Sequence, residues 1–176
     1  MKVYFAAPQN TPYQRDYVQA CTRQLESAGH EVFLAADQYL NHQPAFEVTL
    51  EADGEKLYSD QSQAGRLAKS IFAAEVFKDN YALLAGADAL VALLDGSQVD
   101  DRVACEIGIF YGLMRENPAK RGIIGLATDA RGLRRRDSTY GVNIFTLGTL
   151  EEVGRVVESI EDVIEALRSL PMSFRA

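Results

Sequence analysis

Strand-like and helix-like segments alternate along this sequence, which predicts an α/β protein: a flavodoxin-like, doubly wound, five-stranded parallel sheet with helices on both faces. Residues 89–94, ALVALL, form a continuous apolar run, as expected of a central parallel strand that is covered on both sides. Amphipathic segments closed by glycines, such as Gly29 and Gly86, separate the strand-like runs. We expect a single domain over residues 1–176, because 47% hydrophobic residues suffice for a full core.

The N-terminal part is expected to contain two strands, one helix and an insertion. Residues 2–7 are a β-branched and aromatic run that ends at Pro8, and residues 31–34 have the pattern of a second strand. Between them, apolar residues recur at helical spacing: Tyr13, Tyr17, Cys21 and Leu25. Residues 37–64 are polar and aperiodic, which is typical of a lid or binding loop, and we interpret them as an insertion that covers the site.

The remaining elements continue the alternation. In chain order they are helix 66–84, strand 89–94, helix 103–114, strand 123–126, strand 143–147 and helix 161–170. In the flavodoxin-like order the first and third strands flank the point where ligands bind, beyond the carboxyl ends of the strands. This order selects two loops, residues 7–11 and 95–106, and makes Pro8, Asp95 and Gly96 candidate substrate-binding residues.

Charge and composition argue against several classes of function. A formal net charge of −7 disfavours a nucleic-acid-binding surface, which is usually basic. No run approaches the roughly 18 apolar residues of a membrane helix, and no leader precedes the first strand, so we expect a cytoplasmic protein that does not bind membranes. Basic residues gather in one stretch, as either a solvated loop or an anion site: Arg115, Lys120, Arg121, Arg131, Arg134, Arg135 and Arg136.

Neither a metal nor a redox cofactor is expected. Cysteine and histidine show no metal-ligand spacing, and no glycine-rich dinucleotide or phosphate loop follows a strand. Cys21 and Cys105 lie among apolar neighbours in helix-like segments, so we expect two buried free thiols without a functional role.

The loop after the third strand carries the candidate chemistry. Asp100 and Asp101 stand at the entrance of a predicted helix, where helix capping is the simplest role for them. Glu106 is different, because it shares a helical face with Val103 and Phe110, the face expected to pack inward. Carboxylates are seldom buried without a purpose, and the helix N-terminus is expected to keep this one ionised. The pattern therefore indicates an anionic nucleophile at the crevice.

Residues 100–108, DDRVACEIG, resemble the D-x-G-T-A-x-E-x-G segment of the nucleoside 2-deoxyribosyltransferases. This resemblance extends over residues 2–35 and 72–147. It implies that Glu106 attacks the anomeric carbon of the sugar and that Asp100 helps to hold the sugar. It also implies that Tyr4, in the first strand, orients the nucleophile.

Two asparagines are further candidates by the same resemblance. Asn80 falls where relatives carry an Asp or Asn that contacts the base, although an exposed polar residue on a long helix would give the same pattern. Asn143 resembles the asparagine of an N-L-M segment that reaches the 5′-hydroxyl of the sugar across a subunit interface. The resemblance thus implies a homo-oligomer.

The sequence departs from the family at Arg102, where relatives have Gly, and at Val103, where they have Thr. Glycine permits a close approach of the backbone, so an arginine there implies a different loop path or a side chain aimed at the ligand. Arg102 either binds a 5′-phosphate or pairs with Asp100 or Asp101 in a structural role.

We therefore predict a nucleoside 2-deoxyribosyltransferase that moves 2-deoxyribose between nucleobases by double displacement, through a covalent glycosyl intermediate on Glu106. Its expected partners are 2′-deoxynucleosides, nucleobases and further copies of the same chain. One alternative is an N-glycosidase that hydrolyses 2′-deoxynucleosides or their 5′-monophosphates, which the arginines favour and Asn143 opposes. Another is a nucleotide-sensing module that kept the crevice and lost turnover.

Overall fold

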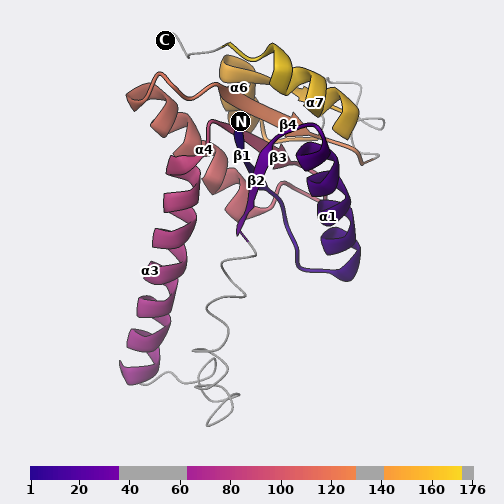
Figure 1. The fold of residues 1–176 in the computed structure, drawn as a ribbon. Helices are drawn as coiled ribbons and strands as arrows, with labels where there is room; N and C mark the ends of the chain where they lie inside the picture. Colours follow the sequence, from indigo (N-terminus) through magenta and orange to yellow (C-terminus); the bar gives the residue numbers. More distant parts are fainter. Residues whose placement is uncertain (36–62, 130–140, 172–176) are drawn as a thin grey trace. The chain divides into compact units, whose positions relative to one another are not determined.

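A five-stranded parallel sheet forms the centre of the computed structural model, which describes residues 1–35, 63–129 and 141–171 (Figure 1). The strands are β1 (Lys2–Ala6), β2 (Glu31–Leu34), β3 (Ala89–Leu93), β4 (Gly122–Leu126) and β5 (Gly154–Val157). Their order is β2-β1-β3-β4-β5, and every neighbouring pair is parallel. The predicted flavodoxin-like sheet is confirmed, with β1 and β3 side by side at its switch point.

The helices are α1 (Pro12–Ser27), α3 (Gln63–Gly86), α4 (Asp101–Glu116), α6 (Ile144–Val153) and α7 (Ile160–Ser169). The chain divides into two compact units, one comprising Met1–Leu34 with Leu84–Ala176 and the other Ala35–Leu83. The sheet, α1, α4, α6 and α7 lie in the first unit. The lid predicted at residues 37–64 lies outside the described residues, apart from its last two positions, which begin α3.

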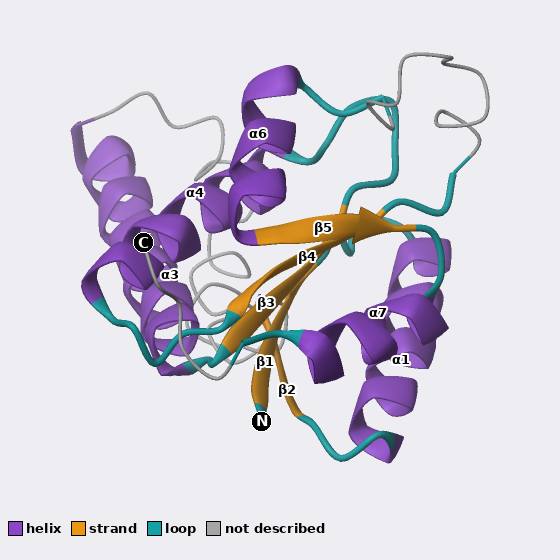
Figure 2. Cartoon of the chain, turned by 90° about the horizontal axis from the view of Figure 1, so that it is seen from above, coloured by secondary structure: helices purple, strands orange, loops and turns teal. Residues whose placement is uncertain are grey.

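Two helical layers cover the sheet. Figure 2 shows α1 and α7 together on one face, with α4 and α6 on the other. Along β1, Val3 and Phe5 belong to the core that faces α1 and α7. Because successive side chains of a strand point to opposite faces, Tyr4 lies on the α4 side. This alternation decides which residue of β1 meets the helix that carries Glu106.

The fifth strand was predicted in the wrong place. The segment 143–147 is not a strand, because Asn143 caps a helix: its Oδ1 accepts the backbone N–H of Phe145 at 2.9 Å. Buried apolar residues then recur at three-residue spacing along α6, at Leu147, Leu150 and Val153. The strand that pairs with β4 comes later, at Gly154–Val157, a four-residue segment too short to stand out in the sequence.

Two side-chain predictions on the helices also need correction. Cys21 is buried as expected, but Cys105 is exposed because α4 turns Glu106 and Ile107 inward instead. Tyr13 was predicted on the apolar face of α1, yet its side chain is 86% exposed. α1 packs on the sheet through Val18, Cys21 and Leu25, which lie further along the helix than Tyr13.

Lys120 and Arg121, two members of the basic stretch, donate hydrogen bonds to backbone carbonyl groups. The ammonium group of Lys120 is buried and donates to the carbonyl oxygens of Leu84, Ala85 and Ala87 at 3.1, 3.1 and 2.7 Å. Arg121 donates to the carbonyl oxygens of Leu170 and Pro171 at 2.7 and 3.0 Å. These contacts anchor the segments that enter β3 and leave α7, so neither side chain is a free anion ligand.

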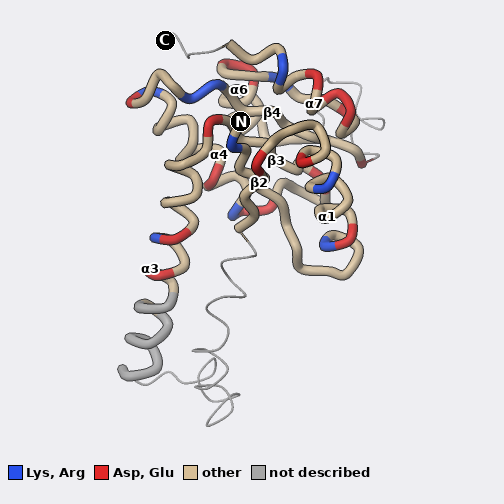
Figure 3. The backbone as a smooth tube through the Cα atoms, viewed as in Figure 1, with Lys and Arg blue, Asp and Glu red and all other residues tan. Residues whose placement is uncertain are grey.

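Other charged groups are mixed along the helices. Figure 3 shows Asp and Glu interspersed with Lys and Arg along α1, α4 and α7. The arginines at 131 and 134–136 lie outside the described residues, and so does any anion site that they would form. No helix in the part of the chain that the structure describes is long and apolar enough to cross a membrane.

We expect Gly154→Ala to lower the free energy of unfolding by about 1–3 kcal/mol or more, measured by urea denaturation. A Cβ atom at residue 154 would lie 1.7 Å from the backbone oxygen of Ile123, so β4 and β5 would have to separate. Gly148→Ala is the matched control, because a Cβ there meets no described atom within 4 Å. In the middle of α6 the control is expected to stabilise by up to about 1 kcal/mol. Equal stability of the two variants would contradict this account of the β4–β5 pairing.

Candidate active site

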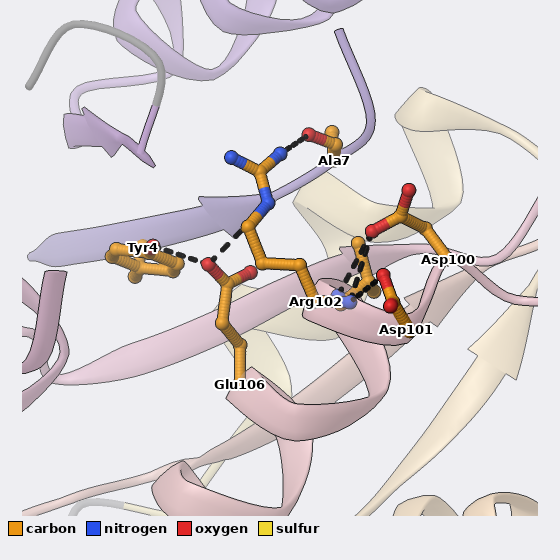
Figure 4. Close-up of polar contacts among 7 residues, drawn as sticks. Tyr4, Ala7, Asp100, Asp101, Arg102 and Glu106 are labelled. Carbon is orange, nitrogen blue, oxygen red and sulfur yellow. Dashed lines mark hydrogen bonds and ion pairs between the residues drawn. The ribbon is translucent and has the colours of Figure 1, made fainter. Parts of the chain in front are cut away.

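Tyr4 and Glu106 meet at the switch point, although they are 102 positions apart in the sequence. The Tyr4 hydroxyl donates to Glu106 Oε1 at 2.8 Å, and both side chains are buried (Figure 4). β1 supplies the tyrosine from the face that α4 covers, and α4 supplies the glutamate from its inward face. The structure therefore brings together the first strand and the helix after the third, as the sequence predicted.

The aspartates at the start of α4 cap the helix. Asp100 is the N-cap, and its Oδ1 accepts from the backbone N–H groups of Arg102 and Val103 at 3.1 and 3.4 Å. Asp101 accepts from the same N–H of Arg102 at 2.8 Å. These bonds satisfy amide groups that have no partner within the helix. They fix the direction of α4 and, through it, the position of Glu106; contact between Asp100 and a sugar stays a prediction.

Arg102 has different partners from those predicted. Its side chain does not pair with Asp100 or Asp101, whose carboxylates face the backbone. Instead, Nη2 donates to the carbonyl oxygen of Ala7 at 2.6 Å, and Nε lies 3.9 Å from Glu106 Oε1 (Figure 4). The reason is helical geometry, because residues four apart lie on the same side of a helix. The guanidinium thereby connects the end of β1 with the inward face of α4.

The two oxygens of Glu106 have unequal surroundings. Oε1 receives the hydrogen bond from Tyr4 and faces the guanidinium of Arg102. Oε2 is buried and has no hydrogen-bond partner among the described residues. A buried polar atom without a partner is costly, and such atoms often mark functional positions. Oε2 is therefore the oxygen whose lone pairs are available for reaction.

Burial is the largest of the influences that shift the pKa of Glu106. Loss of hydration raises the pKa of its carboxyl group, and the negative charge of Asp100 raises it further. The charge of Arg102 and the hydrogen bond from Tyr4 lower the pKa again, in that order of size. Glu106 lies in the second turn of α4, beyond the first turn where the helix dipole acts most strongly. Burial and the carboxylate together raise the pKa of Tyr4, which keeps its hydroxyl protonated as a donor.

Asp95 and Gly96 join two loops. Asp95 accepts from the backbone N–H groups of Thr128 and Asp129 at 2.6 and 3.2 Å and from the Thr128 hydroxyl. In return, the Gly96 N–H donates to Asp129 at 2.8 Å, from a φ of +126° that favours glycine. The loops after β3 and β4 are thus tied together, and a direct substrate contact for Asp95 or Gly96 stays a prediction.

Thr128 and Asp129 were missed in the sequence. The available signal was their place directly after a strand, because the carboxyl ends of neighbouring parallel strands meet at one edge. In the part of the chain that the structure describes, no group of three or more His, Cys, Asp or Glu side chains is arranged to hold a metal ion.

The remaining candidates lie in three different elements. Pro8 is buried and follows Ala7, the residue that accepts from Arg102. Asn80 lies on α3, in the unit Ala35–Leu83, and its contact with a base stays a prediction. Asn143 is exposed at the N-terminus of α6, beside the apolar side chains of Ile144 and Phe145, which are 72% and 84% exposed.

Two solved structures share this fold. A conserved protein from Enterococcus faecalis V583 is 23% identical with a TM-score of 0.58, and the match covers 96% of this chain and 97% of that one. A 2-deoxyribosyltransferase from Bacillus psychrosaccharolyticus is 20% identical with a TM-score of 0.54, and the match covers 93% and 90%. A comparison with curated protein sequences gave no match.

The sequence comparison with protein families is more specific. Residues 3–166 match the family described as Nucleoside 2-deoxyribosyltransferase, and this range includes Tyr4, Asp100, Arg102, Glu106 and Asn143. The match spans nearly the whole chain and both elements that build the site. This chain belongs to the nucleoside 2-deoxyribosyltransferase family.

Proposed function

We propose that this protein transfers 2-deoxyribose between nucleobases by double displacement, with Glu106 as the nucleophile. The observation that carries the proposal is the asymmetry of the Glu106 carboxylate: Oε1 is held by Tyr4 and Arg102, whereas Oε2 is buried and accepts no hydrogen bond from any residue that the structure describes. A carboxylate nucleophile needs one oxygen fixed and the other directed at the reacting carbon. Membership in the deoxyribosyltransferase family supports the choice of substrate.

The proposed reaction has two displacements. In the first, Oε2 of Glu106 forms a bond to the anomeric carbon while the bond to the base nitrogen breaks, and the base leaves with the electron pair and takes up a proton from solvent. In the second, a nitrogen of another base attacks the same carbon and gives its proton to solvent, while the bond to Oε2 breaks and its electron pair returns to Glu106. Two inversions give net retention, as in retaining glycosidases.

Tyr4 has a positioning role in this scheme. Its protonated hydroxyl donates to Oε1 throughout, so rotation of the carboxylate about its last bond is restricted and Oε2 keeps its direction. Asp100 is the proposed sugar contact, at the beginning of the same helix. Asn80 is the proposed base contact, and Pro8, Asp95 and Gly96 remain candidates for the walls of the crevice.

The alternative reaction is hydrolysis, in which water replaces the second base. A 5′-phosphate specificity would need a cation near the sugar, and Arg102 is the candidate for it. Its guanidinium is instead engaged with the Ala7 carbonyl and the Glu106 carboxylate, which favours a substrate without a phosphate. This argues against a nucleotide substrate, and the family match is the support for transfer over hydrolysis.

The proposed enzyme is a homo-oligomer in which the segment around Asn143 completes the site of a neighbouring copy. Its support is the exposure of Ile144 and Phe145, large apolar side chains at the beginning of α6. Exposed apolar side chains that lie together are typical of interaction surfaces. In a cyclic dimer the same segment would serve both sites.

Product analysis tests the reaction class. We expect a 2′-deoxynucleoside, incubated with a second free base, to give a new nucleoside with retained configuration at the anomeric carbon. Chromatography separates the possible outcomes, because hydrolysis gives free 2-deoxyribose and a sensing module gives no product. Free sugar as the main product, with the second base in excess, would contradict the transferase proposal.

The nucleophile is tested with Glu106→Gln and Glu106→Ala. We expect either change to lower kcat by at least about a thousandfold, because no ester can form. Circular dichroism and thermal unfolding provide the control, since loss of a buried charge should leave the fold intact. A Glu106→Ala protein that keeps a tenth of the wild-type rate would refute the assignment.

The oligomer is tested with Phe145→Glu. We expect wild-type protein to sediment as an oligomer at micromolar concentration, and the variant to dissociate and lose exchange activity, because a charge in an apolar interface is costly. Tyr13→Glu is the matched control, since Tyr13 is similarly exposed (86%) but lies on α1, which covers the opposite face of the sheet. A fully active wild-type monomer would exclude this arrangement.

A further inference from the structure

We propose that Arg102 is a positioning residue that promotes breakdown of the glycosyl ester by stabilising the Glu106 carboxylate as a leaving group. The inference rests on the proposed role of Glu106 as nucleophile. It assigns to Arg102 a function through another residue, rather than a contact with the substrate.

The guanidinium is held from two sides. Nη2 donates to the carbonyl oxygen of Ala7 at 2.6 Å, and Ala7 is only 1% exposed at the end of β1. The side chain starts from α4, one turn before Glu106, and places Nε 3.9 Å from Oε1. An anchored arginine loses less conformational entropy on pairing than a free surface side chain, so its charge acts at a fixed place.

Arg102 and Tyr4 act on the same oxygen. Tyr4 donates to Oε1 from β1, and Nε of Arg102 approaches Oε1 from α4, so neither blocks Oε2 (Figure 4). Besides these two groups, Asp100, at the N-cap of α4, is a negatively charged group near the carboxylate. Arg102 is the only cation among these three groups.

The charge on Glu106 changes during the reaction, and Arg102 responds to that change. The free carboxylate is negative and pairs with the guanidinium, whereas the ester is neutral and leaves Arg102 without that partner. When an incoming base attacks the anomeric carbon, the bond to Oε2 breaks and its electron pair returns to the carboxylate. Arg102 stabilises that developing charge, so it favours ester breakdown relative to ester formation.

The same interaction governs ionisation. Burial raises the pKa of Glu106, and Arg102 makes the largest opposing contribution. A neutral side chain at residue 102 removes this contribution, so the pKa rises further. The carboxylate is the active form. As the pH falls, a variant with a neutral residue 102 therefore loses activity at a higher pH than the wild-type protein does. A more basic carboxylate is also a poorer leaving group, so both effects have one cause.

The experiment compares wild-type protein with Arg102→Met and Arg102→Gln, which remove the charge but keep an extended side chain. Two quantities are measured: the acid limb of the pH profile of kcat/KM for base exchange, and the fraction of enzyme present as ester. The ester is counted by mass spectrometry of intact protein after an acid quench, at saturating deoxynucleoside and a fixed concentration of acceptor base. We expect the limb to move to higher pH and the ester fraction to rise about fivefold.

Two controls separate charge from local structure. Arg102→Lys keeps the positive charge. Its acid limb should therefore lie close to the pH of the wild-type limb, and its ester fraction should be close to the wild-type value. Arg115→Met removes a cation of the same helix that pairs with Glu152 at 3.9 Å and is not among the groups that shift the Glu106 pKa. It should leave both quantities unchanged.

The outcomes distinguish this inference from the proposed function. If both neutral variants have the same acid limb and ester fraction as the wild-type protein, the role of Arg102 is overturned. Ester detected on the wild-type protein would in that case still support Glu106 as the nucleophile. A loss confined to KM for 5′-monophosphates would also overturn it, in favour of a phosphate contact. Absence of ester from every protein, with exchange activity present, would instead overturn the proposed mechanism.

Discussion

The hydrogen bond between Tyr4 and Glu106 is the contact on which the rest of the site depends. It joins the first strand to the helix after the third strand, and only the order β2-β1-β3 places these elements side by side. The alternation along β1 directs Tyr4 toward α4 and sends Val3 and Phe5 to the opposite core. A shift of one residue in this register would replace the hydroxyl with an apolar side chain and leave a buried carboxylate without a donor.

Polar contacts around the start of α4 hold the helix that buries Glu106. Asp100 and Asp101 fix the first turn of α4, and the paired loops of Asp95 and Asp129 hold the adjoining edge of the sheet. Neither pair touches Glu106 by a direct hydrogen bond, but both restrict where α4 begins. A carboxylate in apolar surroundings is useful only if its direction is fixed, and these capping contacts fix it before any substrate binds.

Sequence reasoning was successful where the pattern is local and periodic. The apolar run 89–94 and the inward helical face of Glu106 follow from strand and helix periods, whereas Tyr4 was singled out by the resemblance to the family. It failed at residues 143–147, where β-branched and aromatic residues suggested a strand but the Asn143 cap begins a helix. The contact of Arg102 with Ala7 could not be derived, because the Ala7 carbonyl is 95 residues away and a backbone acceptor leaves no mark in the sequence.

The surroundings of Oε1 also impose a compromise on the carboxylate. In the proposed mechanism, donors that stabilise the charge of the carboxylate make Oε2 less basic, which would weaken it as a nucleophile and improve it as a leaving group. A double displacement forms and then breaks the same bond, between Oε2 and the anomeric carbon. A very basic carboxylate would slow the breaking step, and a very weakly basic one would slow the forming step. Burial acts in one direction, and Tyr4 and Arg102 act in the other.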